Sequence, residues 1–182
     1  MQWQPVRTGL ELVGPPVAHF LRSAAPELLT AVDVAPIDPT ASDTAQFCER
    51  YEIEPELSAN CVVVAGKREG EMRYAACLVR ATERADVNGT VRRLLNVRKA
   101  SFLAMEDAVS LTGMAYGGIT ALGLPSGWRI LLDSAVADSR RPMVIGSGVR
   151  ESKLQLSGPT LTALLPTAER IEGLAVSVRV MQ

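Results

Sequence analysis

Hydrophobic positions in the first third of the chain recur at helical spacing in two places. In "GPPVAHFLRSAA", two prolines stand where a helix can begin, and apolar residues follow three and four positions apart until Pro26. In "SDTAQFCERY", Ser42 or Asp43 can cap a helix that places two aromatic residues on one face. The pattern predicts these two short helices, with an edge strand, "AVDVAPI", between them.

The middle of the chain predicts the start of a sheet. "NCVVVAG" and "MRYAACLVRA" are rich in strand-forming residues and flank the turn-like "KREGE", which is typical of an antiparallel hairpin. Beyond the hairpin, "ADVNGTVRRLLN" indicates a helix from Asp86, "RKASFL" a short strand, and "MEDAVSLTG" a helix closed by Gly113.

Three further strands are expected in "WRILLDSAV", "PMVIGSG" and "SKLQLSG", and a last helix in "GPTLTALLP". Because strands and short helices alternate irregularly around one obvious hairpin, we expect an α+β fold with a mixed sheet. The whole chain, residues 1–182, is expected to be one domain. The segment after Pro166 is expected to pack loosely.

Composition narrows the possible functions. Of 182 residues, 47% are hydrophobic and 21% charged, and the net charge of −1 argues against a broad basic face for DNA, though not against a small basic patch. The three cysteines, Cys48, Cys61 and Cys77, lack the spacing of a disulfide framework or a zinc site. The N-terminus lacks the pattern of a signal peptide and no apolar run reaches the ~18 residues of a membrane span. We therefore expect a reduced, cytoplasmic protein with no membrane association.

The segment "YGGITALGLP" has three glycines and no charge. Glycines let the backbone approach a ligand closely, so the segment can form the wall of a pocket. The alternative is a helix stop followed by turns, with "LPSG" as a type I turn. A phosphate-binding loop is excluded, because neither glycine-rich phosphate motif is present.

Several motifs in order resemble the YbaK/prolyl-tRNA synthetase-associated domain family, whose members include free-standing deacylases of mischarged aminoacyl-tRNA. These motifs are "SANCVVV", "RKASF", "LTGMAYGGITALGLP", "LLDSAV", "VIGSG" and "KLQL", and they cover roughly residues 40–165. The resemblance implies an α+β domain with a curved mixed sheet, and a small pocket lined by the glycine segment.

One position departs from the family. Active members carry a lysine near the start of the first long strand, and the matching residue here is Asn60. An amide can hydrogen-bond a hydroxyl or phosphate, but it brings no charge to a developing oxyanion. Lys67, seven residues further on, is either a substitute or an ordinary solvated lysine. Ala121 and Leu122 also replace residues frequent in the family, so the preferred amino acid cannot be transferred.

The resemblance implies two further sets of residues. Asn60, Gly118 and Asp133 are candidates for catalysis, while the candidates for substrate binding are Thr44, Gly117, Ile119, Gly146 and Ser147. Each polar candidate has a structural alternative: Asp133 and Thr44 can cap a turn or helix, and Ser147 can sit in a bulge. His19 is expected on a helix surface, and Cys61 in the core unless a base activates its thiol.

Basic residues occur in two groups. Arg92, Arg93, Arg98 and Lys99 fall within eight positions, and Arg140, Arg141, Arg150 and Lys153 flank the later strands. Such groups usually form a solvated face. The resemblance implies that the first group contacts phosphates of the tRNA acceptor end.

The sequence thus favours an aminoacyl-tRNA deacylase acting in trans, with aminoacyl-tRNA as its partner, without a metal or other cofactor, and with homodimerisation or synthetase association as further possibilities. The alternative from another class is a non-catalytic module that binds aminoacyl-tRNA or a small amino-acid-like ligand. Asn60 favours this alternative, because it removes the family's charged group.

Overall fold

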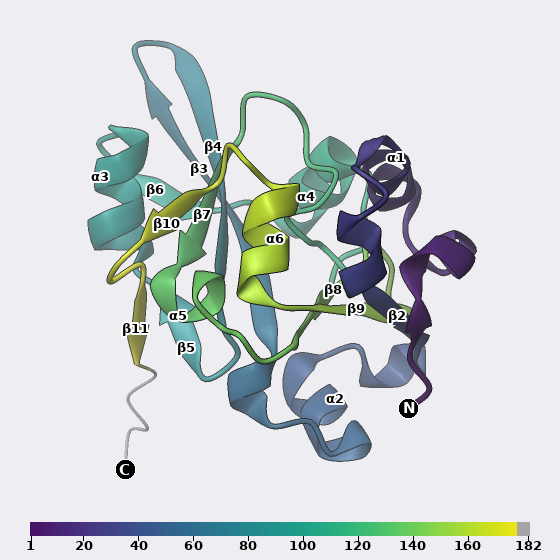
Figure 1. Cartoon of the computed structure of the whole chain (residues 1–182). Coiled ribbons are helices and arrows are strands. Elements are labelled where there is room, and N and C mark those ends of the chain that lie inside the picture. The colour runs from purple at the N-terminus through teal and green to yellow at the C-terminus, as the bar shows by residue number, and fades with distance from the viewer. Residues whose placement is uncertain (178–182) are drawn as a thin grey trace.

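The computed structural model describes residues 1–177. Helices and strands are interleaved irregularly, and the strands form two main sheets and a two-stranded one (Figure 1). The expected α+β class with a mixed sheet is confirmed. In the described part of the chain, no helix is long and apolar enough to cross a membrane.

The strands are β1 (Gln4–Pro5), β2 (Asp33–Pro36), β3 (Ala59–Arg68), β4 (Glu71–Arg80), β5 (Glu83–Ala85), β6 (Ala100–Phe102), β7 (Arg129–Asp133), β8 (Met143–Gly146), β9 (Ser152–Leu156), β10 (Glu169–Ile171) and β11 (Ala175–Ser177). The α-helices are α1 (Pro15–Ser23), α2 (Thr44–Tyr51), α3 (Arg92–Leu95), α4 (Met105–Thr112), α5 (Ser134–Ala137) and α6 (Gly158–Leu164). Short helical turns are η1 (Val6–Thr8), η2 (Leu10–Leu12), η3 (Leu28–Ala31), η4 (Pro39–Ala41), η5 (Pro55–Leu57) and η6 (Val87–Val91).

The larger sheet has the strand order β10-β7-β4-β3-β6. Its β10–β7 and β7–β4 pairs are parallel, whereas β4–β3 and β3–β6 are antiparallel. The second sheet, β1-β2-β9-β8, is antiparallel throughout. A parallel bridge between Ser58 and Val144 connects the start of β3 with β8, so the two sheets meet there.

The β3–β4 hairpin forms where the sequence predicts it. The strands pair from Ala59 and Arg80 to Arg68 and Glu71. The two turn residues, Glu69 and Gly70, have φ values of 52° and 89°. Two positive φ angles match the right-handed twist of a two-residue hairpin, and glycine supplies one of them without steric cost.

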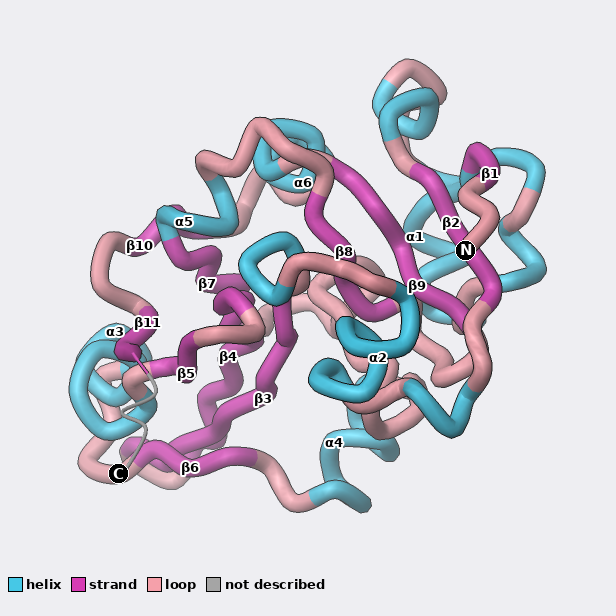
Figure 2. The backbone as a smooth tube through the Cα atoms, turned by 90° about the horizontal axis from the view of Figure 1, so that it is seen from below, coloured by secondary structure: helices cyan, strands magenta, loops and turns pink. Residues whose placement is uncertain are grey.

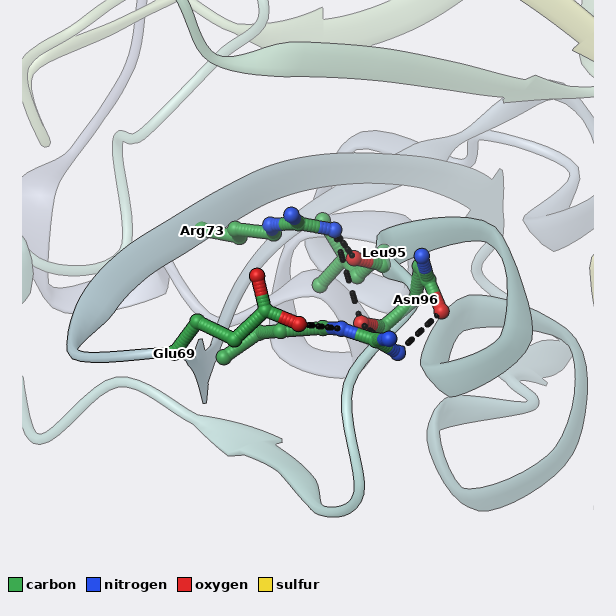
Figure 3. A network of polar contacts seen from close by, with 5 residues as sticks. Glu69, Arg73, Leu95 and Asn96 are labelled. Atoms are coloured by element: carbon green, nitrogen blue, oxygen red, sulfur yellow. Dashed lines mark hydrogen bonds and ion pairs between the residues drawn. The ribbon is translucent and has the colours of Figure 1, made fainter.

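The tip of the hairpin is tied to the end of α3 (Figure 3). Arg73 Nη1 donates to the Leu95 carbonyl at 3.0 Å, and Arg68 Nη1 donates to Asn96 Oδ1 at 2.6 Å. Arg68 Nε also donates to Glu69 Oε1 at 3.2 Å. The last carbonyls of a helix lack intrahelical partners, so cationic donors stabilise this end. Both arginines therefore hold the hairpin against α3.

Alternation along β3 directs its side chains into two cores. Val63 packs with Ala108 of α4, whereas Val64 packs with Leu95 of α3. Because neighbouring strand residues point to opposite faces, α3 and α4 cover opposite faces of the sheet. Figure 2 shows these two helices on either side of β3. The largest core cluster lies against the other sheet and includes Leu21, Leu154 and Leu161.

The segment after Pro166 differs from its prediction. As far as Ser177 it adds β10 to β7 and β11 to β5, and Leu174 is fully buried. Arg129 Nε donates to Glu169 Oε1 at 2.7 Å and fixes β10. The expectation of loose packing was wrong, because the partners of this segment come from β5 and β7, far away in sequence.

Two other elements are corrected. The predicted helix from Asp86 begins with the π-helical turn η6, in which Asp86 accepts hydrogen bonds from Gly89 N and Thr90 N. A Cβ at position 89 would lie 2.2 Å from Asp86 Oδ2, so a larger residue there would displace the carboxylate that caps this turn. The strand expected through residue 136 ends at Asp133, which caps α5 instead.

Candidate functional site

A pocket of about 320 Å³ opens where β6 stops pairing with β3. The ladder covers only Val64 to Gly66, with one further hydrogen bond from Leu103 N to Val63 O at 3.0 Å. In an antiparallel ladder, alternate residues direct both backbone groups to the same side. The N–H and C=O of Cys61 therefore face the uncovered edge, where they can contact a ligand.

The pocket wall is drawn from both sheets, from α2 and α4, and from the glycine segment. Its lining residues are Ser42, Asp43, Thr44, Ala59, Asn60, Cys61, Val62, Val63, Phe102, Leu103, Ala108, Tyr116, Gly117, Ile119, Gly146 and Lys153. The inner wall is small and apolar, and its polar groups are few, as in pockets for small molecules.

Asn60 and Thr44 act as a pair on this wall. Thr44 Oγ1 donates to Asn60 Oδ1 at 2.6 Å, which leaves the Asn60 amide nitrogen as the donor for a ligand. Thr44 is the first residue of α2, and the helix cap is provided by Asp43, which accepts from Ala45 N and Gln46 N. Capping therefore does not occupy the Thr44 hydroxyl.

The glycine segment contributes Gly117 and Ile119 to the wall, while Gly118 lies behind it. Gly117 has φ 87°, a conformation that favours glycine. Gly118 is buried, its N–H donates to Ala115 O at 2.9 Å, and its carbonyl accepts from Gly148 N at 2.7 Å. A Cβ on Gly118 would lie 2.3 Å from Val149 O. Gly118 thus permits close backbone packing that holds the wall in place.

Lys153 enters the pocket from β9. Its side chain is only 7% exposed, and Nζ donates to Ser42 O at 3.3 Å and lies 5.4 Å from the centroid of the Phe47 ring. Among residues 1–177 no carboxylate lies within ion-pair distance of it. Burial lowers the pKa of Lys153, since the interior penalises its charged form.

The structure brings Thr44, Asn60, Gly117, Ile119 and Gly146 together around one pocket. All five were predicted as site residues from the sequence. Their common location supports the choice of this pocket as the candidate site.

The polar groups of Asp133 and Ser147 are directed elsewhere. Asp133 Oδ1 accepts from Ala135 N and Oδ2 from Ala175 N, at the end of β7. Ser147 Oγ donates to Ser152 O at 2.8 Å and is fully buried. Both side chains therefore hold structure: Asp133 caps α5, which was its structural alternative, and Ser147 links the end of β8 to β9.

Ala121 and Leu122 do not shape this pocket, because both are fully buried in the largest core cluster. The apolar residues that line it include Val63, Ala108 and Ile119. The departure from the family at positions 121 and 122 therefore lies in the core and not in the pocket wall.

The three thiols are poorly suited to nucleophilic chemistry. Burial raises the pKa of Cys61, which lines the pocket. Burial also raises the pKa of Cys77, to about 12. A thiol is a weak nucleophile compared with its thiolate, so Cys61 stays inert near neutral pH. Within residues 1–177, no cluster of three or more His, Cys, Asp or Glu side chains could hold a metal ion.

The basic residues of the first group lie on different faces. Arg92 and Arg93 are exposed on α3, on the face of the sheet opposite α4. Arg98 and Lys99 line a depression with Lys67 that shares Phe102 and Leu103 with the pocket. Lys67 is the penultimate residue of β3, seven residues or about 23 Å from Asn60 along the strand. It therefore lies outside the pocket.

Sequence reasoning missed two aromatic residues at the pocket mouth and the position of Lys153. Phe102 is 59% exposed and Tyr116 54% exposed, although both line the pocket. A large apolar side chain that remains exposed beside a cavity is a frequent mark of a binding site. No signal in the sequence marked Lys153 as buried, because lysine is almost never fully buried and this one alternates with the apolar residues of "SKLQL".

Comparison with known proteins identifies the fold and the family of the chain. Two solved structures share the fold: a hypothetical protein named APE2540, with TM-score 0.73, 14% identity and coverage of 88% of this chain and 99% of that one; and a candidate trans-editing enzyme for prolyl-tRNA synthetase, with TM-score 0.68, 18% identity and coverage of 87% and 97%. No curated protein matches the chain in sequence. The family model of the aminoacyl-tRNA editing domain matches residues 38–164, a range that contains every pocket residue, and the chain belongs to this family.

Proposed function

We propose that the protein is a trans-acting deacylase, which hydrolyses the ester between a wrong amino acid and the 3′ end of a tRNA. The observation that carries the proposal is the pocket, in which five predicted residues of an editing domain meet around a cavity of amino-acid size. Translation takes place in the cytoplasm, so the proposed activity belongs there.

The chemistry needs few groups. Water adds to the ester carbonyl, the bond from that carbon to the ribose oxygen breaks, and the ribose oxygen takes up a proton. Donors aimed at the carbonyl oxygen stabilise the charge that develops on it. The Asn60 amide and the Cys61 N–H at the free edge of β3 are two donors in the pocket wall that can take this role.

Other surfaces of the protein in and beside the pocket can bind the remaining parts of the substrate. The small apolar wall of Val63, Ala108 and Ile119 fits an amino-acid side chain. Phe102 and Tyr116 at the mouth offer rings on which the terminal adenine can stack. Arg98 and Lys99 lie in the adjoining depression and can bind phosphates of the acceptor end.

The second candidate is a binding module without turnover, which Asn60 favours because it is neutral where active relatives are expected to carry lysine. A panel of mischarged tRNAs separates the two functions. A deacylase releases at least one amino acid faster than the spontaneous rate, and Asn60→Ala slows that release.

The outcome that contradicts the deacylase has two parts: the parent hydrolyses no member of the panel, and Asn60→Lys creates activity. Asn88→Lys is the matched control, since it adds the same charge at an exposed position before α3. Association with a synthetase or a second copy remains a prediction, which analytical ultracentrifugation of the mixed proteins can test.

A further inference from the structure

A buried lysine without an acidic partner is the least expected feature of the pocket. Lys153 is held on three sides by protein: Ser42 O accepts its hydrogen bond, the ring of Phe47 lies beneath it, and β2 and β8 flank its strand. The remaining side is the pocket. A cation costs free energy in such a place unless something of opposite charge compensates it.

The charged and titratable groups around Lys153 compensate its burial only in part. Asp43 is the carboxylate whose charge acts on Lys153, and its Oδ1 is engaged as the cap of α2. Arg150 acts with the same sign as Lys153, and burial raises the pKa of Cys48, which keeps that thiol neutral near pH 7. An anion that enters the pocket is therefore the natural partner.

The backbone places this cation beside the other polar groups of the site. Lys153 pairs with Gly146 across the β8–β9 ladder, and directly paired residues project from the same face. The absence of a side chain on Gly146 lets the backbone of the glycine segment approach this face, because a Cβ there would lie 2.5 Å from Gly118 O and 2.6 Å from Ile119 O. On the other side, residues 42 to 44 connect the two polar groups, since Ser42 O accepts from Lys153 while Thr44 donates to Asn60.

We propose that Lys153 forms an anion subsite of the pocket, which binds one anionic oxygen group of the ligand from β9 rather than from β3. The ligand chemistry has two possible sources in an aminoacyl-tRNA end: a phosphate next to the terminal adenosine, or a carboxylate in the amino-acid side chain. The anion subsite itself is inferred from the surroundings of Lys153, and only the choice of these two ligands rests on the proposed function.

The test measures binding rather than turnover. For the phosphate, the affinity of adenosine 5′-monophosphate is compared with that of adenosine. For the carboxylate, the non-hydrolysable 3′-aspartylamino-3′-deoxyadenosine is compared with its asparaginyl counterpart. A charge-assisted hydrogen bond predicts that one anionic probe binds at least about 10-fold tighter than its neutral partner in the parent protein.

The variants identify the residue responsible. Lys153→Met should abolish the preference, Lys153→Arg should retain part of it, and Arg22→Met, at an exposed position of α1 that lines neither the pocket nor the adjoining depression, should leave it unchanged. In the Lys153→Met background, Asn60→Lys should restore a preference from the opposite wall.

The proposal is overturned if neither anionic probe is preferred by the parent, or if folded Lys153→Met keeps the preference, with folding checked by circular dichroism. A parent that shows the preference but hydrolyses no mischarged tRNA, while Asn60→Lys gains that activity, would support the subsite and contradict the deacylase. The two failures are thus distinguishable.

Discussion

Replacing Lys153 by methionine should stabilise the protein. Methionine has a similar length, so it fills the same space without charge. The substitution removes one charged hydrogen bond, worth about 1.5–3 kcal/mol, and one contact with an aromatic ring, worth about 0.5–2 kcal/mol. It also removes the cost of burying the ammonium group of a residue that is only 7% exposed, which is several kcal/mol.

Because no ion pair within residues 1–177 compensates that cost, we expect a net gain. The free energy of unfolding at pH 7 should rise by about 1–4 kcal/mol. Urea denaturation followed by circular dichroism measures this value. Lys99→Met is the control: Lys99 is exposed, so the change should stay within about 0.5 kcal/mol.

The gain should also depend on pH with a definite sign. The folded-state pKa of Lys153 is below its ordinary value of 10.5, so the unfolded chain binds more protons between the two values. The penalty is complete below the folded-state pKa and disappears as pH rises toward 10.5. The advantage of Lys153→Met should therefore shrink with pH. A loss of more than about 1 kcal/mol at pH 7 would refute the reasoning.

Three further predictions concern other parts of the molecule. Gly146→Ala should lower the free energy of unfolding by about 1–3 kcal/mol, because its Cβ would lie 2.5 Å from a backbone oxygen of the glycine segment; an unchanged melting temperature contradicts this packing. Glu169→Gln should cost about 0.5–1 kcal/mol at pH 7. The hydrogen bond with Arg129 lowers the pKa of Glu169, so the stability is present above pH 4.5 and lost as pH falls through the folded-state pKa; a difference that persists at pH 2 contradicts it. Reversing the charges of Arg98 and Lys99 should reduce the salt slope of tRNA binding by about 1 to 2. Reversing Arg92 and Arg93 on α3 should reduce this slope less. Equal slopes for the two variants would contradict the proposal that the acceptor end lies over the depression next to the pocket.

Much of the fold could be predicted because its signals are local. The cap at Asp43 begins α2, and the turn at Glu69 and Gly70 closes the hairpin, each within a few residues of the sequence. The packing of Leu174 could not be predicted, since it depends on β5 and α3. The π-helical turn was missed because it depends on how both oxygens of Asp86 bind the backbone.

The candidate site was predicted in part for a similar reason. Asn60, Gly117 and Ile119 were identified from motif order, and the structure places all three on the pocket wall. Asp133 was chosen as a polar strand end, but its oxygens satisfy two backbone amides. Lys153 was grouped with surface cations, because its burial follows from the position of β9 between β2 and β8. Strand order of this kind cannot be read from one sequence.

The central claim is that this pocket receives the aminoacylated end of a tRNA. A crystal structure with a 3′-aminoacylamino-3′-deoxyadenosine tests it most directly. We predict the amino-acid side chain against Val63 and Ile119, the carbonyl oxygen within hydrogen-bond distance of Asn60 or the Cys61 N–H, and the adenine on Phe102 or Tyr116. A ligand bound elsewhere, or in the pocket with its carbonyl turned away from β3, would contradict the account.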